Sequence, residues 1–89
     1  MSLPNIDKLV ASKGVYIVND TTEATKTIDG ILVLSDTVFS SIKVGGVDVK
    51  SSYISTTGTA VKAGAYITGI GVKFSGVTLS SGQVALILG

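Results

Sequence analysis

The stretch from Gly64 to Leu88 is GAYITGIGVKFSGVTLSSGQVALIL, in which single glycines separate short runs of alternating apolar residues. β-branched and aromatic residues favour strands, whereas isolated glycines favour turns. The stretch ends with five consecutive apolar residues, Val84–Leu88. Such a strand needs cover on both of its faces, which a small chain has difficulty supplying. These residues therefore predict a β fold whose last strand is covered in part by a partner subunit.

Similar strand signals recur toward the N-terminus, separated by a polar turn at Asp20–Thr25 and a turn signal at Asp29-Gly30. Short, closely spaced strands indicate a small antiparallel sandwich, barrel-like or prism domain. We expect a single β domain over residues 14–89, completed by oligomerisation. We expect residues 1–13 to form an N-terminal arm, within which Ile6–Ser12 is either a helical turn or extended. The predicted strands are Gly14–Asn19, Ile31–Ser35, Val38–Val44, Val47–Ile54, Ala60–Lys62, Ala65–Ile70, Val72–Leu79 and Gln83–Leu88.

The clearest hairpin signal lies in IKVGGVDVK, from Ile42 to Lys50. Its central Gly45-Gly46 suits a two-residue turn in which both residues have positive φ. Only one pairing register then places all the apolar residues on one face and the two charged residues together on the other. The predicted pairs are Val44–Val47, Ile42–Val49 and the ion pair Lys43–Asp48.

Within Val72–Leu79 the apolar residues shift from even to odd positions. Val72 and Phe74 are even-numbered, whereas Val77 and Leu79 are odd-numbered, so a regular strand would place the two pairs on opposite faces. A bulge at Ser75-Gly76 would return all four side chains to a common face. The alternative is a strand that leaves one sheet and enters another at that point.

The composition leaves oligomerisation as the main way to stabilise this domain. The chain has 89 residues, of which 45% are hydrophobic and only 15% charged, and it lacks Cys, His and Trp. Small domains usually rely on disulfides, a metal or oligomerisation, and disulfides cannot form without cysteine. A zinc-type site is excluded as well, because imidazole and thiolate ligands are missing. The low charge indicates that part of the surface is buried in an assembly.

Catalytic and cofactor chemistry finds little support in the sequence. Nucleophile–base pairs of the usual kind need His or Cys, and the six acidic residues are dispersed through turns and strand ends. Gly69-Ile70-Gly71 lacks the following helix of a phosphate-binding loop. The net charge of +1 and the absence of Arg disfavour nucleic-acid binding. We therefore expect no catalytic residues, no metal, no cofactor, no nucleic-acid partner, no membrane span and no signal peptide.

Several residues in the second half of the chain follow a known pattern. The motif AG-x-YI-x-G followed by F-x-x-VTL-x-SG-x-VALI, around Gly64–Ile87, resembles the C-terminal part of small tailed-phage virion structural proteins. DTVFSSI at Asp36–Ile42 is similar to their D-x-x-F-x-x-I segment, and Gly58–Gly64 to the strand before their glycine turn. The resemblance covers about Asp36–Leu88. Those proteins usually carry Gly-Arg-Phe where this chain has a longer segment without arginine before Phe74.

The resemblance implies a non-enzymatic head-decoration or head-fibre component, made in the host cytoplasm and attached to the virion. It also implies a homo-oligomer, expected to be a homotrimer, in contact with capsid or other virion proteins. We expect the N-terminal arm to contact a neighbouring subunit or the capsid. The residues expected to form the shared core and oligomer interface are Ile67, Phe74, Val77, Leu79, Val84, Leu86 and Leu88.

A small β-sandwich module that binds carbohydrate or a receptor is the alternative function. Its candidate site consists of Tyr53 and Asp48 among the Ser and Thr residues that follow the hairpin. The absence of Trp, the preferred sugar-stacking residue, argues against this alternative.

Overall fold

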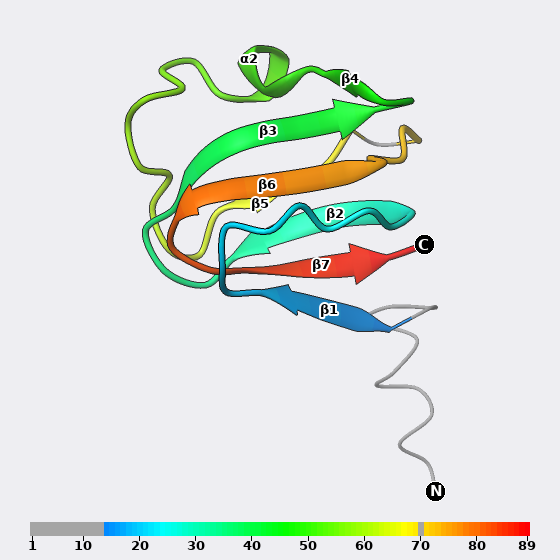
Figure 1. The fold of residues 1–89 in the computed structure, drawn as a ribbon, viewed down its shortest axis with the longest axis horizontal. Helices are drawn as coiled ribbons and strands as arrows, with labels where there is room; N and C mark the ends of the chain where they lie inside the picture. Colours follow the sequence, from blue (N-terminus) through cyan, green and yellow to red (C-terminus); the bar gives the residue numbers. More distant parts are fainter. Residues whose placement is uncertain (1–13, 70) are drawn as a thin grey trace, which may run out of the picture.

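The computed structural model describes residues 14–69 and 71–89, which form two antiparallel sheets (Figure 1). The predicted N-terminal arm and its candidate helical turn lie outside the described residues. One short helix, α2 (Lys50–Tyr53), follows β4. The prediction of a small antiparallel all-β fold is confirmed. The four-stranded sheet has the order β1 (Val15–Val18), β7 (Val84–Leu88), β2 (Ile28–Val33) and β5 (Tyr66–Ile67), and the three-stranded sheet has the order β4 (Val47–Asp48), β3 (Val38–Val44) and β6 (Gly76–Ser81).

The two sheets are joined at one corner, where the β2–β3 and β6–β7 connections run side by side (Figure 1). The backbone N–H of Leu34 donates to the Gln83 carbonyl at 3.0 Å, and the Gln83 N–H donates to the Ser35 hydroxyl at 3.1 Å. Thr37 is fully buried here, and its hydroxyl donates to the Ser35 carbonyl at 2.7 Å. Both connections therefore satisfy each other's polar groups as they cross between the sheets.

The hydrophobic core lies between the sheets, and Phe74 is its largest fully buried side chain. Phe74 pairs with Ile28 of β2, whereas Gly76 already pairs with Lys43 of β3. The chain thus passes from one sheet to the other at Ser75. This is the second of the two possibilities that the phase change in Val72–Leu79 left open, and it explains how Phe74 and Val77 both reach the core.

The β3–β4 hairpin has the predicted turn and register. Val44 pairs with Val47 and Lys43 with Asp48, and Gly45 and Gly46 have φ of 58° and 83°. The predicted Lys43–Asp48 ion pair is wrong. Lys43 Nζ instead lies 3.0 Å from Glu23 Oε2, while the Asp48 carboxylate accepts backbone N–H groups.

Several predicted strands are shorter than the sequence suggests. The strand expected at Val47–Ile54 ends at Asp48, because Asp48 Oδ1 accepts the Lys50 N–H at 3.0 Å and turns the chain into α2. Ala60–Lys62 contributes only the single bridge Val61–Thr37. Ala65–Ile70 contains only β5 within its described part.

The turn predicted at Asp29-Gly30 is also wrong, since both residues lie inside β2. The register of β2 against β7 shifts between Ile28 and Gly30, which leaves Asp29 as an extra, bulged residue. Its carboxylate lies 2.8 Å from Lys73 Nζ at the end of the sheet. Glycine and aspartate are common in bulges as well as in turns, so the Asp29-Gly30 pair marks a bulge inside β2 and not a turn.

Candidate interaction surface

The residues predicted to form a shared interface lie in the core of the single chain. Ile67, Phe74, Val77, Leu79, Val84 and Leu86 are buried, and Leu88 is partly buried against them. Side chains that pack between the two sheets of one chain cannot also contact a second subunit. Any surface that meets a partner must therefore lie elsewhere.

The opposite side of the four-stranded sheet is apolar as well. Because side chains alternate between faces, β7 directs Val84, Leu86 and Leu88 into the core and Ala85 and Ile87 outward. The pairing register extends this second side across all four strands as two cross-strand rows. One row is Ile17, Ala85, Leu32 and Tyr66, and the other is Val15, Ile87 and Gly30; we call these seven residues the outer face.

The outer face is accessible and contiguous. Val15, Ile17 and Tyr66 are 43%, 47% and 52% exposed. Ala85 at its centre is only 5% exposed, since the larger Ile17 and Leu32 flank it across the strands. The Tyr66 side chain lies over Gly30. Its ring occupies the space that a side chain at position 30 would otherwise take. Seven adjoining positions thus form one apolar surface.

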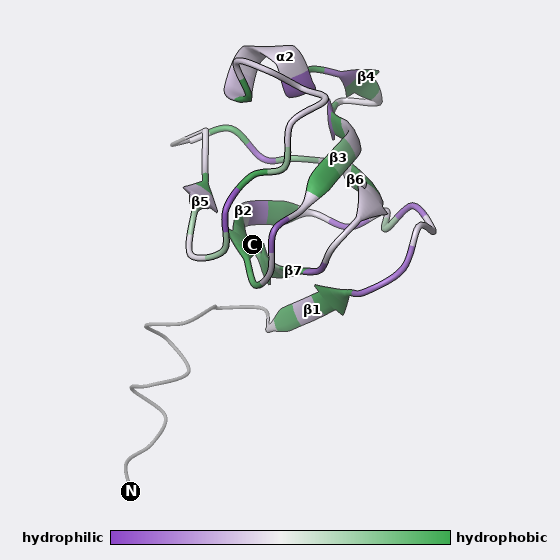
Figure 2. Cartoon of the chain, turned by 90° about the vertical axis from the view of Figure 1, so that its left-hand side faces the viewer, coloured by the Kyte–Doolittle hydropathy of each residue, from purple (hydrophilic) through white to green (hydrophobic). Residues whose placement is uncertain are grey.

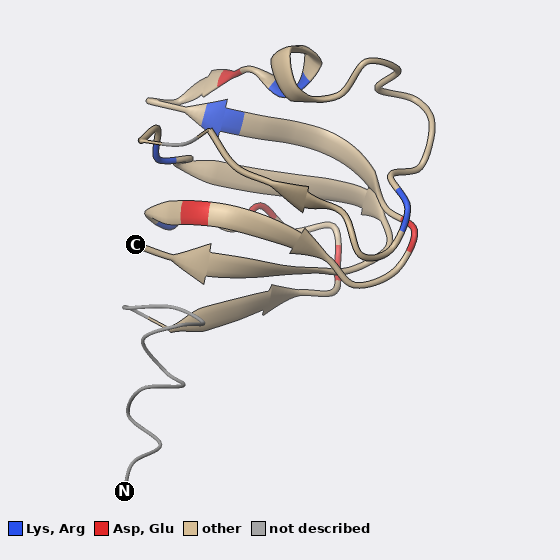
Figure 3. Ribbon diagram, turned by 180° about the vertical axis from the view of Figure 1, so that it is seen from behind, with Lys and Arg blue, Asp and Glu red and all other residues tan. Residues whose placement is uncertain are grey.

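Charged residues are absent from this surface. Figure 2 shows β1 as predominantly hydrophobic, β7 consists of Val-Ala-Leu-Ile-Leu, and Figure 3 shows no charge on either strand. The Asp29–Lys73 ion pair lies at one end of the sheet, and at the other end Asn19 follows β1 and Gln83 precedes β7. An apolar centre with a polar rim is the usual anatomy of a protein–protein contact.

The predicted ligand residues do not form a site. Tyr53 is half-buried on α2, and its ring packs edge-on against Phe74 with centroids 5.2 Å apart. Asp48 is exposed, but its Oδ1 accepts the backbone N–H groups of Ile42 and Lys50 at 3.2 and 3.0 Å. The bond from Lys50 is the main cause that lowers the pKa of Asp48. Both side chains therefore have structural partners, and the exposed tyrosines are Tyr16 and Tyr66 instead.

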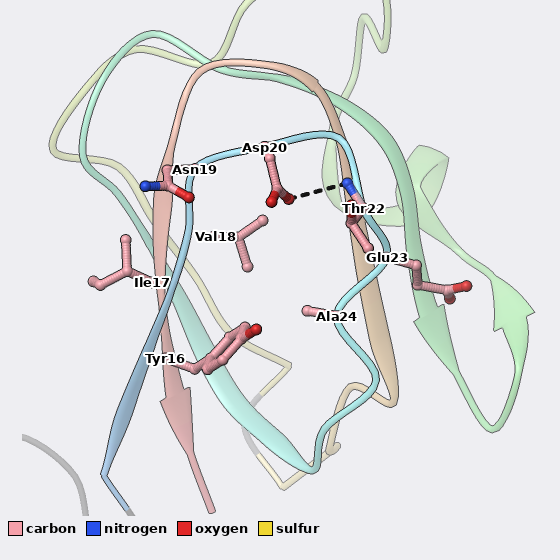
Figure 4. A pocket seen from close by; sticks show the side chains of 8 residues that line it. All are labelled: Tyr16, Ile17, Val18, Asn19, Asp20, Thr22, Glu23 and Ala24. Carbon is pink, nitrogen blue, oxygen red and sulfur yellow. Dashed lines mark hydrogen bonds between the residues drawn. The ribbon is translucent and has the colours of Figure 1, made fainter.

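A cavity of about 140 Å³ lies between β1 and the segment that follows it (Figure 4). Asp20 Oδ1 accepts the Thr22 N–H at 3.0 Å, and Glu23 is paired with Lys43. Lys26 Nζ lies 4.6 Å from the centroid of the Tyr16 ring nearby. The two carboxylates that line this small cavity are thus each engaged, Asp20 by the Thr22 N–H and Glu23 by Lys43.

Within residues 14–69 and 71–89, no group of three or more Asp, Glu, His or Cys side chains is placed to hold a metal ion. No helix in the same described part is long and apolar enough to cross a membrane. Asp36 also has a lowered pKa, first because it accepts the Ala63 N–H and second because Lys62 lies beside it. This carboxylate fastens the Lys62–Gly64 turn rather than forming part of a reactive cluster.

Comparison with known proteins adds no relative: no family model, no curated protein and no solved structure matches the chain. The sequence does indicate a second apolar face, because Val84–Leu88 is apolar at both its even and its odd positions. It could not disclose which of the two sets of side chains faces inward, and the structure places Val84, Leu86 and Leu88 toward the core.

Proposed function

We propose that this protein is a non-enzymatic structural component of a tailed-phage virion, acting through homo-oligomeric β assembly. The observation that carries the proposal is the outer face, an apolar and charge-free surface that spans all four strands of one sheet. Exposed surfaces of this kind with a polar rim mark interaction sites. The resemblance over Asp36–Leu88 supports a role in head decoration or in a head fibre, and it supports a homotrimer as the assembly.

The composition agrees with this role. Only 15% of residues are charged, against about 25% in an average globular domain, and mean hydropathy is +0.58. A surface with so few charges agrees with burial in an assembly. The carbohydrate-binding alternative has no comparable observation in its favour, because Tyr53 and Asp48 are occupied by Phe74 and by backbone N–H groups.

The assembly part of the proposal is tested by light scattering after size exclusion. We expect the purified chain to have a mass that is a multiple of 9.0 kDa and is stable to dilution. Leu32→Asp, in the middle of the outer face, should reduce that mass. Val47→Asp is the matched control, because Val47 is 64% exposed on the other sheet. A stable monomer, or equal effects of the two variants, would contradict assembly through the outer face.

The virion part needs a separate measurement. An antibody raised against the purified chain should label intact tailed virions from the same source, and the protein should co-sediment with them in a fixed copy number per particle. Its absence from purified virions would overturn the proposed role, whatever its oligomeric state.

A further inference from the structure

Strand β1 is an open sheet edge of four residues in the described part of the chain. It pairs with β7 on one side and with no described strand on the other. The edge strands β4 and β5 contain only two residues each, and the outer side of β6 is bridged by Ala24. Four consecutive residues of β1, Val15–Val18, therefore stand at an edge that nothing else in the described fold covers.

The hydrogen-bond alternation shows which backbone groups this edge presents. Gly14 accepts the Leu88 N–H at 3.0 Å, and the register pairs Tyr16 with Leu86 and Val18 with Val84. In an antiparallel ladder, alternate residues direct their N–H and C=O groups to the same neighbour. Gly14, Tyr16 and Val18 thus bond toward β7, whereas Val15 and Ile17 direct two N–H and two C=O groups away from the sheet.

The four residues of β1 themselves carry none of the usual protections of an edge strand, and Lys26 from the segment that follows lies over the Tyr16 ring. Native sheets shield such edges with lysine, proline, bulges or very short strands. Val-Tyr-Ile-Val carries no charge and no proline, and its register with β7 is continuous. Val15, Tyr16 and Ile17 are each more than 40% exposed, and Figure 4 shows Ile17 on the opposite side of the strand from Tyr16 and Val18. Unprotected edges of this kind favour addition of another strand.

We propose that β1 pairs antiparallel with β1 of a second copy of this chain, across a two-fold axis at Tyr16. In this register Val15 faces Ile17 of the second copy, and the two residues exchange both backbone hydrogen bonds. The same pair recurs on the other side of the axis, so all eight outward-directed groups are satisfied. A two-fold contact uses the same patch on both subunits, and an antiparallel strand edge meets that condition without any further complementarity.

The pairing also extends the outer face. Val15 and Ile17 lie on that face beside Ile87 and Ala85, so their counterparts in the second copy continue both apolar rows across the axis. The result is one eight-stranded sheet with an uninterrupted apolar side. This inference rests on the proposed homo-oligomer and adds a two-fold contact at the β1 edge to the contact proposed through the outer face. A closed trimer has no two-fold axis, so β1 pairing predicts a dimer, or a hexamer when a three-fold contact is also present.

Cysteine cross-linking tests the register directly, because the natural chain contains no cysteine. Tyr16 faces its own counterpart at a position without ladder hydrogen bonds, where Cα atoms are about 4.5 Å apart, within disulfide range. Tyr16→Cys should therefore give a covalent dimer on mild oxidation. Ile17→Cys should cross-link at least about tenfold more slowly, because diagonal positions are roughly 7–8 Å apart. Tyr66→Cys on β5 is the second control, because Tyr66 is 52% exposed and Tyr16 is 44% exposed.

A backbone variant gives an independent readout. Ile17→Pro removes an N–H that bonds only in the proposed pairing, and proline is tolerated at edge positions with outward N–H groups. We expect it to keep the wild-type circular dichroism spectrum and to lose the two-fold contact. Unchanged mass in Ile17→Pro, or cross-linking that is not fastest at Tyr16, would overturn β1 pairing. A trimer without Tyr16 cross-links would overturn the pairing and still support homo-oligomeric assembly, whereas a dilution-stable monomer would overturn both.

Discussion

The side chain of Tyr66 on β5 lies directly over Gly30 of β2, and a methyl group added at Gly30 would overlap the phenol ring. The two residues are not cross-strand partners, since Tyr66 pairs with Leu32. The ring therefore runs along the outer face toward the second apolar row, where Gly30 pairs with Ile87. A glycine in a strand interior here permits close approach of an aromatic ring.

This relationship predicts a strong coupling between Gly30 and Tyr66. Gly30→Ala should lower the free energy of unfolding by about 1 kcal/mol, because the ring must swing away from its site. In a Tyr66→Ala background the same change should be neutral or slightly stabilising, since glycine is unfavourable in strands. Urea unfolding of the four proteins in a double-mutant cycle measures the coupling. Identical effects in both backgrounds would show that the ring does not occupy this position.

The corner between the sheets makes Gly82 more sensitive than the hairpin glycine Gly46. Both have positive φ, 91° and 83° respectively. A Cβ at Gly82 would lie 2.5 Å from the Asp36 carbonyl oxygen and 2.7 Å from Thr37 Cα, whereas one at Gly46 would meet nothing within 4 Å. We expect Gly46→Ala to destabilise by about 1–2 kcal/mol from backbone strain alone. Gly82→Ala should lose at least about 3 kcal/mol, and thermal unfolding of both variants is the comparison; equal losses would contradict the packed corner.

Asp48 should contribute to acid sensitivity. Its pKa is lowered in the folded state, first by the Lys50 N–H, so the contribution is present above the unfolded pKa of about 3.9 and is lost as pH falls through the folded pKa. Asp48→Ala should reduce stability by about 1 kcal/mol at pH 7. The difference from wild type should shrink below about pH 4. Asp48→Asn retains an acceptor oxygen and should lose less at pH 7. An unchanged difference between pH 7 and pH 3 would show that the carboxylate does not make these bonds in its charged form.

Phe74 should be the most sensitive core position tested by truncation. It is fully buried and holds Tyr53 in an edge-on contact at 80° between ring planes. Phe74→Ala should lose about 3–5 kcal/mol, a large part of the stability of a small domain. Val47→Ala, at a position that is 64% exposed, should change stability by less than about 0.5 kcal/mol. Denaturant midpoints measured by tyrosine fluorescence compare the two, and a small loss for Phe74→Ala would place the ring outside the core.

Local signals in the sequence predicted local structure well. The strand expected at Val38–Val44 coincides with β3, and the Gly45-Gly46 turn has the predicted register. These features depend on residues close together in the chain, where alternation and turn chemistry act directly. The Asp48 carboxylate was misassigned because a side chain that can bond to the backbone two residues ahead competes with a cross-strand ion pair.

Long-range features were beyond the sequence alone. No local signal states that β7 lies between β1 and β2, or that Asp29-Gly30 forms a bulge inside β2 rather than a turn. The location of the candidate surface was the hardest feature to predict, because a strand that is apolar on both faces gives no indication of which face turns inward. The structure resolves this by placing Leu86 in the core and Ile87 on the outer face.

The position of β7 has a consequence for biosynthesis. The last strand of this sequence inserts between the first two, pairing Ile87 with both Val15 and Gly30. A nascent chain that has not yet exposed residues 84–88 to solvent leaves β1 and β2 without their common neighbour. Contacts between such distant segments form slowly, on the millisecond-to-second scale, because the intervening loop must close first. The four-stranded sheet therefore cannot form until Val84–Leu88 is available, and the apolar β1 segment stays unpaired until then, in a state that chaperones could bind.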